Sequence, residues 1–421
     1  MNQNIYAVLK YVALAVGVVI IGALVGWFFV LRSQTQTTLS NDSSRGFGST
    51  APSGSENGSA FSNGISAQPT TPVTSAEPPK PVAQLWHVDT TPVAGFEFTS
   101  SDAHGVYFAE RATGHLFLAD METGQSRRLT NTLRPKTHEA LFARDGSVIL
   151  RNINENTGVL ESFAGTMGTS SGSQPASLLG NMLENNIVSI SLNPNARSLF
   201  YLLRDAGNTI GILSSWGSKS TKRIFTSNIG SWRPILLSDG RVFVSLLAED
   251  AVPGYAYEIR KDGSLSPVQR NIPGLSILPQ ASSTALLFSS SGSDIALFLQ
   301  ASSSANAVAL PLKTIAEKCA WAPFPVKSKT STSTPNIAYC AVPGPAKEGH
   351  FLENWYRGIL HTSDVIWKIN AETGDTQMIY SPESDGEAID ATKLATDPTG
   401  NYLGLINNAD SSFWMLRIQK K

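Results

Sequence analysis

Two cysteines, Cys319 and Cys340, have the most specific chemistry in this chain of 421 residues. They are too few for a structural zinc site, and their spacing does not fit one. Each lies in a short run typical of a β-strand. If the segment between them closes as a hairpin, their side chains face each other across adjacent strands. We expect a disulfide, which persists outside the reducing cytoplasm; two buried free thiols are the alternative.

A long insertion, Val342–Thr362, carries the densest group of side chains suited to binding. The candidate binding residues are His350, Phe351, Trp355, Tyr356 and Arg357. Exposed aromatic and arginine side chains are typical anchors of interfaces, and long loops in compact domains are often functional. We therefore predict that this loop binds a protein, a peptide or a surface polymer. Alternatively, its three aromatic residues fold back as a small plug over the sheet.

The sequence shows no motif for catalysis or for a cofactor. A G-x-S-x-G pattern at residues 168–172 lies in a Ser/Gly loop without the strand and helix that a nucleophile elbow requires. The six histidines match no zinc or calcium motif, and no phosphate-binding or dinucleotide fingerprint is present. Carboxylates at positions 383, 385 and 387 fall in a predicted solvated turn. We predict a protein without metal or cofactor that is not an enzyme.

The element that positions these residues is a repeated strand-turn-strand unit. In Val106–Thr130, apolar residues alternate with the period of a pleated strand, and Thr113-Gly114 and Glu122–Gly124 interrupt the runs. Glycine at these places suits the positive φ of a hairpin turn. The same design returns in Val365–Tyr380 with a second Glu-Thr-Gly turn. A repeated antiparallel unit in a long all-β chain indicates a β-propeller.

The spacing of the inner strands predicts seven blades. We expect them at Val93–Phe98, His138–Ala143, Ile187–Leu192, Trp232–Leu237, Leu275–Pro279, Ala316–Trp321 and Ile389–Ala395. The first six starts are separated by about 41–49 residues, the length of a four-stranded blade. The last interval is longer and holds the insertions of the sixth blade.

The last blade lacks a fourth strand, because the chain stops soon after the predicted strand Phe413–Ile418. At the other end, Gln84–Asp89 is a strand-like run without a partner in the first blade. We therefore expect this N-terminal strand to complete the last blade and close the ring, which removes two exposed sheet edges.

The turns Asp120–Gly124 and Asn370–Gly374, set in units of this length, resemble those of WD-repeat-like and TolB-like bacterial β-propellers. The layout as a whole resembles membrane-anchored propeller proteins of bacteria. This resemblance implies the fold of residues 83–421 and no particular activity. The Trp-Asp dipeptides of true WD repeats are absent, so the hydrogen-bonded tetrad of that family is not expected here.

The N-terminus predicts the location of the protein. Tyr11–Val30 contains no charge and, at about 1.5 Å per residue, spans a bilayer core of about 30 Å. A cleavable signal peptide is the rival, but no small-x-small cleavage site follows this run. We expect residues 1–32 to be a single-pass anchor with a cytoplasmic N-terminus. Residues 33–82 are rich in Ser, Thr, Gly and Pro and form the predicted flexible linker.

The balance of charges in the chain argues against one class of function. Lys+Arg 32 against Asp+Glu 33 leaves no basic excess, which argues against nucleic-acid binding. The sequence therefore predicts a membrane-anchored, extracytoplasmic seven-bladed propeller that acts as a binding scaffold. The alternatives are an accessory subunit for envelope assembly or secretion, and a propeller hydrolase or lyase that acts on glycans. Carboxylates that converge in the central channel would favour the enzyme, and aromatic and neutral polar groups there would favour binding.

Overall fold

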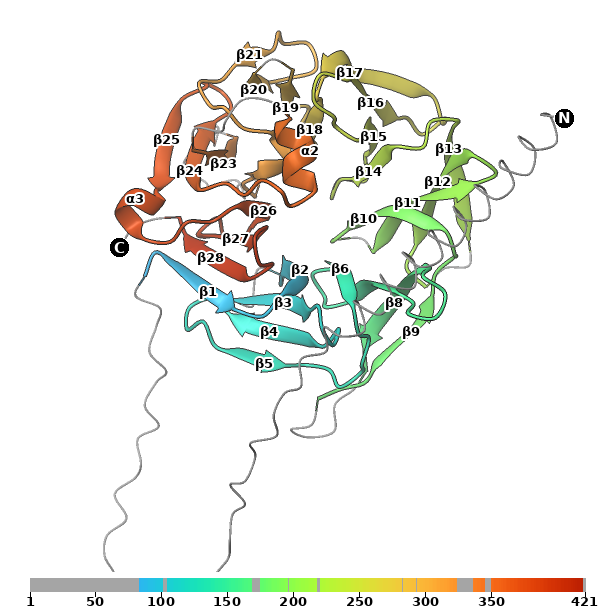
Figure 1. Cartoon of the computed structure of the whole chain (residues 1–421). Coiled ribbons are helices and arrows are strands. Elements are labelled where there is room, and N and C mark those ends of the chain that lie inside the picture. The colour runs from blue at the N-terminus through green and yellow to red at the C-terminus, as the bar shows by residue number, and fades with distance from the viewer. Residues whose placement is uncertain are drawn as a thin grey trace, which may run out of the picture. The chain divides into compact units, whose positions relative to one another are not determined.

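The computed structural model describes residues 83–418 except 101–103, 169–174, 196, 218–219, 282, 293, 324–335 and 345–349. These residues form seven antiparallel sheets of four strands each, set as blades around a central channel (Figure 1). The chain is therefore an all-β, seven-bladed propeller, as the sequence predicts. The expected anchor and the expected linker both lie outside the described residues. Among the described residues, no helix is long and apolar enough to span a bilayer.

Each blade runs from an inner strand at the channel to an outer strand at the rim (Figure 1). The first blade consists of β2 (Val93–Phe98), β3 (Gly105–Glu110), β4 (Leu116–Asp120) and β5 (Ser126–Arg128). The second consists of β6 (Thr137–Phe142), β7 (Val148–Ile153), β8 (Leu160–Met167) and β9 (Leu178–Met182). The third consists of β10 (Ile187–Asn193), β11 (Ser198–Asp205), β12 (Asn208–Ser215) and β13 (Thr221–Ser227). Blades four and five consist of β14 (Trp232–Leu236), β15 (Val242–Leu246), β16 (Pro253–Ile259) and β17 (Leu265–Pro273); and β18 (Ser276–Pro279), β19 (Leu286–Ser291), β20 (Ile295–Gln300) and β21 (Val308–Ala309). The last two consist of β22 (Cys319–Trp321), β23 (Ile337–Pro343), β24 (Asp364–Asn370) and β25 (Thr376–Tyr380); and β26 (Ala391–Thr396), β27 (Tyr402–Asn407), β28 (Phe413–Arg417) and β1 (Leu85–Asp89).

The hairpin turns form because an Asp or Asn side chain binds the backbone ahead of it. Asp120 Oδ1 accepts hydrogen bonds from the N–H groups of residues 122 and 123, and Gly124 then adopts φ 72°. Asn370 begins the matching turn of the sixth blade. A third copy, Asn154–Gly158, has the same geometry in the second blade. An Asx side chain with a glycine four residues later is thus the local signal that fixes the register of these strands.

The hydrophobic core lies between the blades. Seven clusters of buried side chains each join one blade to the next around the ring, and an eighth lies under the helix α2 (Phe351–Tyr356). The contact between the first two blades is so close that a Cβ on Gly95 would lie 2.0 Å from the carbonyl oxygen of Ala140. A single blade therefore buries only part of its apolar surface, and the ring stabilises all seven.

Arginine side chains add polar ties between neighbouring blades. Arg111 donates to the carbonyl oxygen of His138, and Arg151 donates to that of Ile187. Arg204 makes the matching bond to residue 230. Each arginine lies on or directly after the second strand of its blade, and each acceptor lies at or just before the inner strand of the next blade. These bonds satisfy carbonyl groups that irregular inner strands leave unpaired.

The N-terminal strand closes the ring, as predicted. β1 pairs antiparallel with β28, with Leu85 opposite Leu416 and Trp86 opposite Met415. The Trp86 ring packs edge-on against Tyr402, with centroids 6.0 Å apart. The last blade thereby takes strands from both ends of the propeller, and β1 covers the edge that β28 would otherwise expose (Figure 1).

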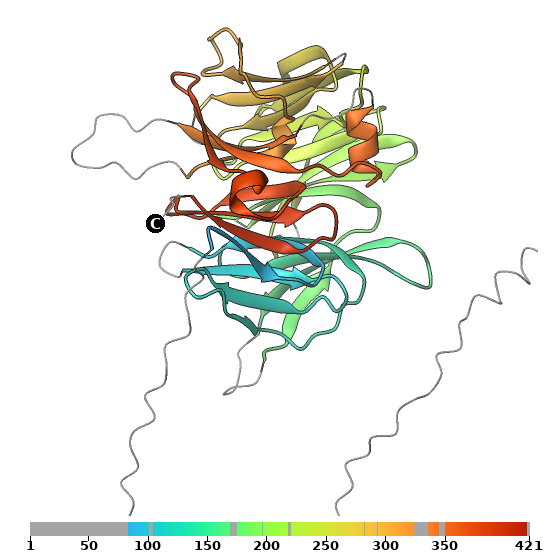
Figure 2. The same ribbon diagram turned by 60° about the vertical axis from the view of Figure 1, so that its left-hand side comes forward.

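The insertion of the sixth blade departs from the all-β prediction. Its segment Phe351–Tyr356 is the short helix α2, and the inner strand of that blade starts with a 3-10 turn, Ala316–Lys318, instead of extended chain. A second short helix, α3, spans Pro382–Asp385. Figure 2 shows α2 on one face of the propeller, which we call the α2 face. Because the strands of each blade alternate in direction, the loops between second and third strands and the links between blades also lie on this face.

Candidate binding site at the central channel

The helix α2 lies over the channel because its apolar side chains are buried beneath it. Phe351, Leu352 and Trp355 pack against Ala248 and Ile315, which belong to the fourth blade and to the segment before the sixth. Asp250 fixes the start of the helix, since its Oδ2 accepts a hydrogen bond of 2.7 Å from the Leu352 N–H group. The loop therefore acts as a plug at the α2 face.

A buried lysine fixes the other side of the plug. Lys318 has no solvent exposure, and its Nζ lies 2.7 Å from Asp364 Oδ2 and 2.7 Å from Asp390 Oδ1. Trp355 Nε1 donates to Asp390 Oδ1 at 2.8 Å. The network therefore joins the start of the sixth blade, the start of the seventh and α2. One buried cation with two carboxylates leaves a net negative charge, which the hydrogen bonds to Asp364 and Asp390 stabilise.

The two aspartates of this network have different pKa values. Burial raises the pKa of Asp364 despite its contact with Lys318. Burial also opposes ionisation of Asp390, but there the Lys318 ammonium and the hydrogen bonds from Trp355 and Thr362 prevail, and they lower its pKa. Asp364 is thus the harder of the two to ionise, and Asp390, the easier one, is also the carboxylate that binds α2.

Tyr356 joins α2 to the channel wall. Its hydroxyl donates to Glu317 Oε1 at 2.5 Å, and Arg233 forms an ion pair with the same carboxylate. The Arg233 guanidinium also lies 5.1 Å from the centre of the Tyr356 ring. Burial, reinforced by the negative charge of Glu317, raises the pKa of the Tyr356 hydroxyl. The hydroxyl is therefore a neutral hydrogen-bond donor at physiological pH.

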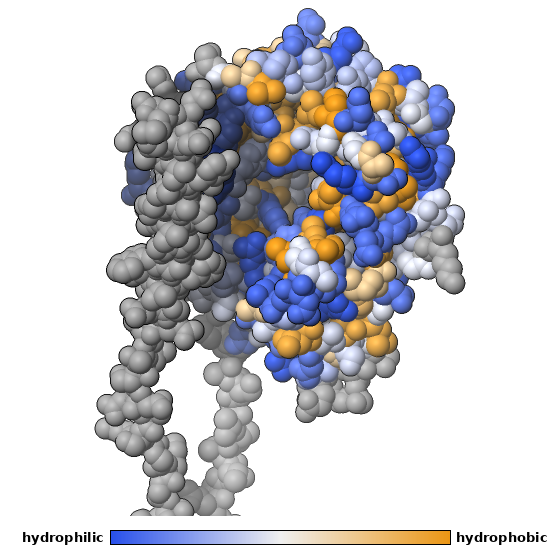
Figure 3. Space-filling view, turned by 45° about the vertical axis from the view of Figure 1, so that its right-hand side comes forward, coloured by the Kyte–Doolittle hydropathy of each residue, from blue (hydrophilic) through white to orange (hydrophobic). Residues whose placement is uncertain are grey.

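A cavity of about 580 Å³ occupies the channel beneath α2. Its wall is contributed by inner strands of several blades, and the space-filling view shows a hollow bordered by hydrophilic and hydrophobic residues (Figure 3). Two carboxylates line it, Glu139 and Glu317. Each is neutralised by an arginine, Glu139 by Arg151 at 2.5 Å and Glu317 by Arg233. Carboxylates that are each paired with an arginine stabilise the structure or bind ligands. Neither of them is free to act as a general acid or base.

The five residues predicted to bind occupy different environments. Phe351 and Trp355 are buried in the plug, while Tyr356 lines the cavity. His350 and Arg357 are exposed at the two ends of α2. For Phe351 and Trp355 the structure therefore shows the alternative arrangement, a plug over the sheet. A binding role for the five residues stays a prediction.

The predicted disulfide is confirmed. Cys319 and Cys340 lie opposite each other on β22 and β23 and are bonded. They join the inner strand of the sixth blade to its neighbour directly below α2. No free cysteine remains in the part of the chain that the structure describes.

Sequence reasoning missed Lys318 and Lys393, the two lysines of the channel region. Each lies in an inner-strand segment whose other residues are mostly uncharged, AEKCAW and ATKLAT. A lysine at such a position is unusual, because burial of an ammonium group needs a partner. The unusual position of the two lysines could therefore be recognised from the sequence, but the groups that they contact could not.

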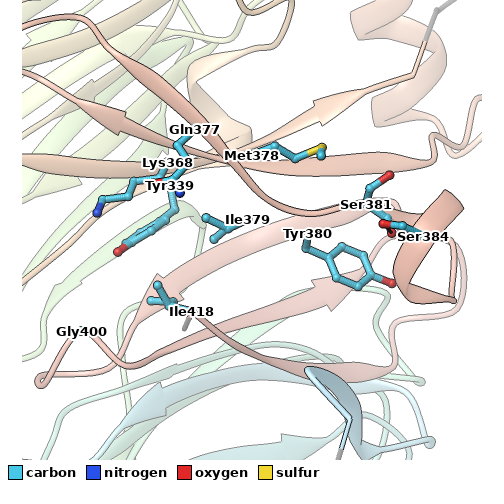
Figure 4. Close-up of a pocket in the computed structure, with 10 residues that line it drawn as sticks. All are labelled: Tyr339, Lys368, Gln377, Met378, Ile379, Tyr380, Ser381, Ser384, Gly400 and Ile418. Carbon is cyan, nitrogen blue, oxygen red and sulfur yellow. Dashed lines mark hydrogen bonds between the residues drawn. The ribbon is translucent and has the colours of Figure 1, made fainter. Parts of the chain in front are cut away.

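A second cavity of about 490 Å³ lies on the outer part of the sixth and seventh blades (Figure 4). Tyr339, Lys368 and Tyr380 are among the residues around it (Figure 4). The Tyr380 hydroxyl donates to the carbonyl oxygen of Glu387, and Lys368 is the one charged side chain among the described lining residues. Lys368 lies beside Tyr339, whereas Ser381 and Ser384 lie at the other end of the cavity (Figure 4).

One trio of described residues has a composition suited to a cation. Ligand atoms of Asp250, His350 and Glu353 lie within 4.8 Å of one another at the start of α2. A hydrogen bond between the two carboxyl groups raises the pKa of Glu353. The Asp250 carboxylate already binds the Leu352 N–H group and the Ser291 hydroxyl. A proton shared between Asp250 and Glu353 is thus sufficient to explain why their two carboxyl groups lie so close together.

Fold and site together define the class: a seven-bladed β-propeller with a plugged, ligand-sized channel. No family model matches the chain, and no curated protein matches it. Solved structures similar to it include an oligogalacturonate lyase from Vibrio parahaemolyticus, with 11% identity, a TM-score of 0.47, and coverage of 80% of this chain and 94% of that one.

Two further propellers are similar at this level. The Cps50 (Swd1) β-propeller domain of Myceliophteria thermophila has 9% identity and a TM-score of 0.47, over 80% of this chain and all of that one. A putative TolB from Agrobacterium tumefaciens has 16% identity and a TM-score of 0.36, over 51% of this chain and 80% of that one. TolB is one of the propeller types that the turn motifs resemble. Similarity at these levels says nothing about what this chain binds.

Proposed function

We propose that this protein is a membrane-anchored, extracytoplasmic scaffold that binds a protein partner on its α2 face. The observation that carries the proposal is the distribution of exposed apolar side chains. Nine of the large exposed apolar residues lie in loops or strand ends of that face: Leu133, Ile153, Val159, Met182, Val188, Ile229, Leu247, Val252 and Ile359. Single exposed apolar residues are ordinary, but their concentration on one face is typical of an interface.

The polar groups of the α2 face favour binding over catalysis. Both carboxylates that line the cavity are held by arginines, and the Tyr356 hydroxyl is held by Glu317. His350 and Arg357 remain exposed beside the plug, where they would form the polar rim of the interface. The glycan hydrolase or lyase is the weaker alternative, because neither carboxylate is free to act as acid or base.

The proposed location rests on two features of the chain. The uncharged run at residues 11–30 is long enough to anchor it, and the Cys319–Cys340 disulfide suits an oxidising compartment. Protease added outside intact cells should cleave within residues 33–82 and release the propeller. A propeller that stays protected until the membrane is permeabilised would contradict this orientation.

The partner face is tested by paired substitutions. Leu247→Asp with Val252→Asp places two charges among the exposed apolar residues of the α2 face, where the side chains are 39% and 48% exposed. Leu265→Asp is the matched control, since it is 44% exposed and begins an outer strand at the opposite face. Partner recovery after crosslinking on intact cells should fall at least tenfold for the first variant and stay unchanged for the control. Equal recovery from both would overturn the assignment of the face.

A further inference from the structure

An irregular inner strand brings a lysine into the channel. β26 pairs with β27 in register up to Thr392, and the pairing resumes only at Ala395. Between them Lys393 adopts φ 49°, a left-handed conformation that costs a lysine about 1 kcal/mol or more. The bulge places the Lys393 side chain where it lines both the 580 Å³ cavity below α2 and an adjoining cavity of about 290 Å³.

The ammonium group of Lys393 has no carboxylate partner among the described residues. Its Nζ donates to the carbonyl oxygen of Ala94 at 3.0 Å and belongs to no ion pair in the part of the chain that the structure describes. The group is surrounded by protein on most sides, yet its side chain remains exposed to the space of the channel. A ligand in either cavity would therefore meet an unneutralised cation.

Other charges at this place also leave an excess of positive charge. Arg111 and Arg151 are close enough to Lys393 to disfavour its charged form, and Glu139 is the one carboxylate that favours it. Arg111 donates to the Ser411 hydroxyl and to a carbonyl oxygen, not to a carboxylate. Three cations thus face one carboxylate, with a net charge of 3 − 1 = +2.

Several polar nitrogens around this cluster have no hydrogen-bond partner among the described residues. They are the donors Nε of Arg111 and Nε of Arg151, and Nδ1 of His138, whose role as donor or acceptor depends on the tautomer. The Arg151 side chain is only 4% exposed. Arg111, Arg151 and His138 line neither cavity, so the two arginines contribute positive charge behind Lys393, and Lys393 is the cation that a ligand would contact.

The rest of the cavity wall is largely apolar. Ile277, Leu278, Trp355 and Tyr356 line the larger cavity, and Phe96 and Phe142 line the smaller one. An inorganic anion would leave these surfaces in contact with water. An organic acid with an apolar body would cover them while its charge reaches the lysine.

We infer that the channel is a binding site for a carboxylate joined to an apolar group, with Lys393 as its charged anchor. The inference rests on the proposed binding function and names the chemistry that the channel recognises. The carboxylate could belong to a peptide or to a small free acid, because both present the same oxygens to the same ammonium group.

Protonation should be coupled to this binding. Burial, together with Arg111 and Arg151, lowers the pKa of Lys393 in the free protein, and Glu139 only partly opposes them. Two other titratable side chains lie nearby. His138 also has a lowered pKa, chiefly through burial, and Glu97 lines the smaller cavity with Lys393 and has its pKa raised by burial to about 7. A bound carboxylate stabilises the ammonium form and raises the pKa of Lys393. Affinity should therefore decrease as pH rises through the lowered pKa, and binding should take up protons in that range.

The test uses the full-length protein in detergent and titration calorimetry with four probes. They are acetyl-Gly-Phe with a free α-carboxylate, its C-terminal amide, acetyl-Glu-Phe amide, which carries only a side-chain carboxylate, and 3-phenylpropionate. We expect at least one carboxylate probe to bind at least tenfold more tightly than the neutral amide. The probe that binds best distinguishes a chain terminus, an acidic side chain and a free small acid as the source.

Variants assign the effect to Lys393. Lys393→Met should weaken the best carboxylate at least tenfold and leave the amide unchanged, whereas Lys393→Arg should keep most of the affinity. Lys368→Met is the matched control, since it removes the same charge at the outer cavity. Circular dichroism confirms that each variant is folded.

Three results would overturn the inference. If the acid and its amide bind equally, or if Lys393→Met binds the carboxylate like the unchanged protein, the channel binds ligands without the proposed anchor, and the binding function stands. If no carboxylate probe binds, the channel does not take this chemistry. The proposed function would then be judged by its own crosslinking experiment on the α2 face.

Discussion

Glu97 carries a carboxyl group that its position makes hard to ionise. It lies on β2 beside the smaller channel cavity, and burial raises its pKa from the usual 4.5 to about 7, although Arg144 opposes the shift. Since the pKa is higher in the folded state, Glu97 contributes stability that is complete below pH 4.5 and is lost as pH rises through 7. Glu97 therefore stabilises the folded protein least above pH 7, where its buried carboxyl group is ionised.

Glu97→Gln should remove this pH dependence. The amide has nearly the same shape and does not ionise, so the variant should be more stable than the unchanged protein by about 2 kcal/mol at pH 8 and equal to it near pH 4.5. Denaturant unfolding at both pH values measures the difference. Glu372→Gln, at an exposed turn, is the control. A Glu97→Gln variant whose stability differs by the same amount at both pH values would show that ionisation is not the cause.

At the scale of elements, α2 depends on tertiary contacts for its existence. Six residues are too few for a helix to persist alone in water. Burial of Phe351, Leu352 and Trp355 holds it, together with the bond from Trp355 to Asp390. This explains why the sequence did not predict α2: so short a segment gives no helical period, and its partners lie far away along the chain.

Asp390→Asn should loosen the plug. The substitution removes one of the two carboxylates that face Lys318 and weakens the acceptor for Trp355. Breaking a buried pair of this kind costs about 3 kcal/mol, part of which Asp364 offsets. We expect lower stability in denaturant and faster amide hydrogen exchange in α2. Asp375→Asn, in an exposed turn of the sixth blade, should leave both unchanged. Unaltered exchange in α2 would mean that apolar packing alone holds the helix.

At the scale of the whole molecule, the ring is closed by a strand from the far end of the propeller. β1 supplies the fourth strand of the last blade, and its Trp86 and Val88 side chains pack on the cluster that joins the last blade to the first. Without it, the β28 edge would be exposed and available for pairing with another chain.

Interruption of β1 tests the closure. Replacing Trp86 and Val88 by Asp should lower the melting temperature by roughly 10 °C, since two half-buried apolar side chains of the closure are lost. Size-exclusion chromatography should show association through the freed edge. Replacing Thr90, an exposed residue directly after β1, by Asp is the control. Equal melting temperatures for all forms would show that the ring holds without its N-terminal strand.

The sequence predicted the propeller for reasons that the structure explains. Asx turns and alternating apolar residues are local, so Asp120, Gly124 and Asn370 could be recognised without the rest of the chain. The closure followed from an unpaired strand at each end. The channel site could not be predicted in this way, because Lys318, Asp364 and Asp390 meet only when blades six and seven pack together. Lys393 enters the channel through a β-bulge, and no residue type in the sequence predicts that bulge.

The most direct test of the account is site-specific photo-crosslinking on intact cells. One crosslinker replaces Ile359, which is 68% exposed beside α2, and the other replaces Asp262 in an exposed turn of the opposite face. The account predicts a discrete protein adduct from position 359 and none from position 262, and the adduct from 359 should be lost when Leu247 and Val252 are replaced by Asp. An adduct from position 262 alone, or the same adduct from both positions, would contradict the assignment of the α2 face as the binding surface.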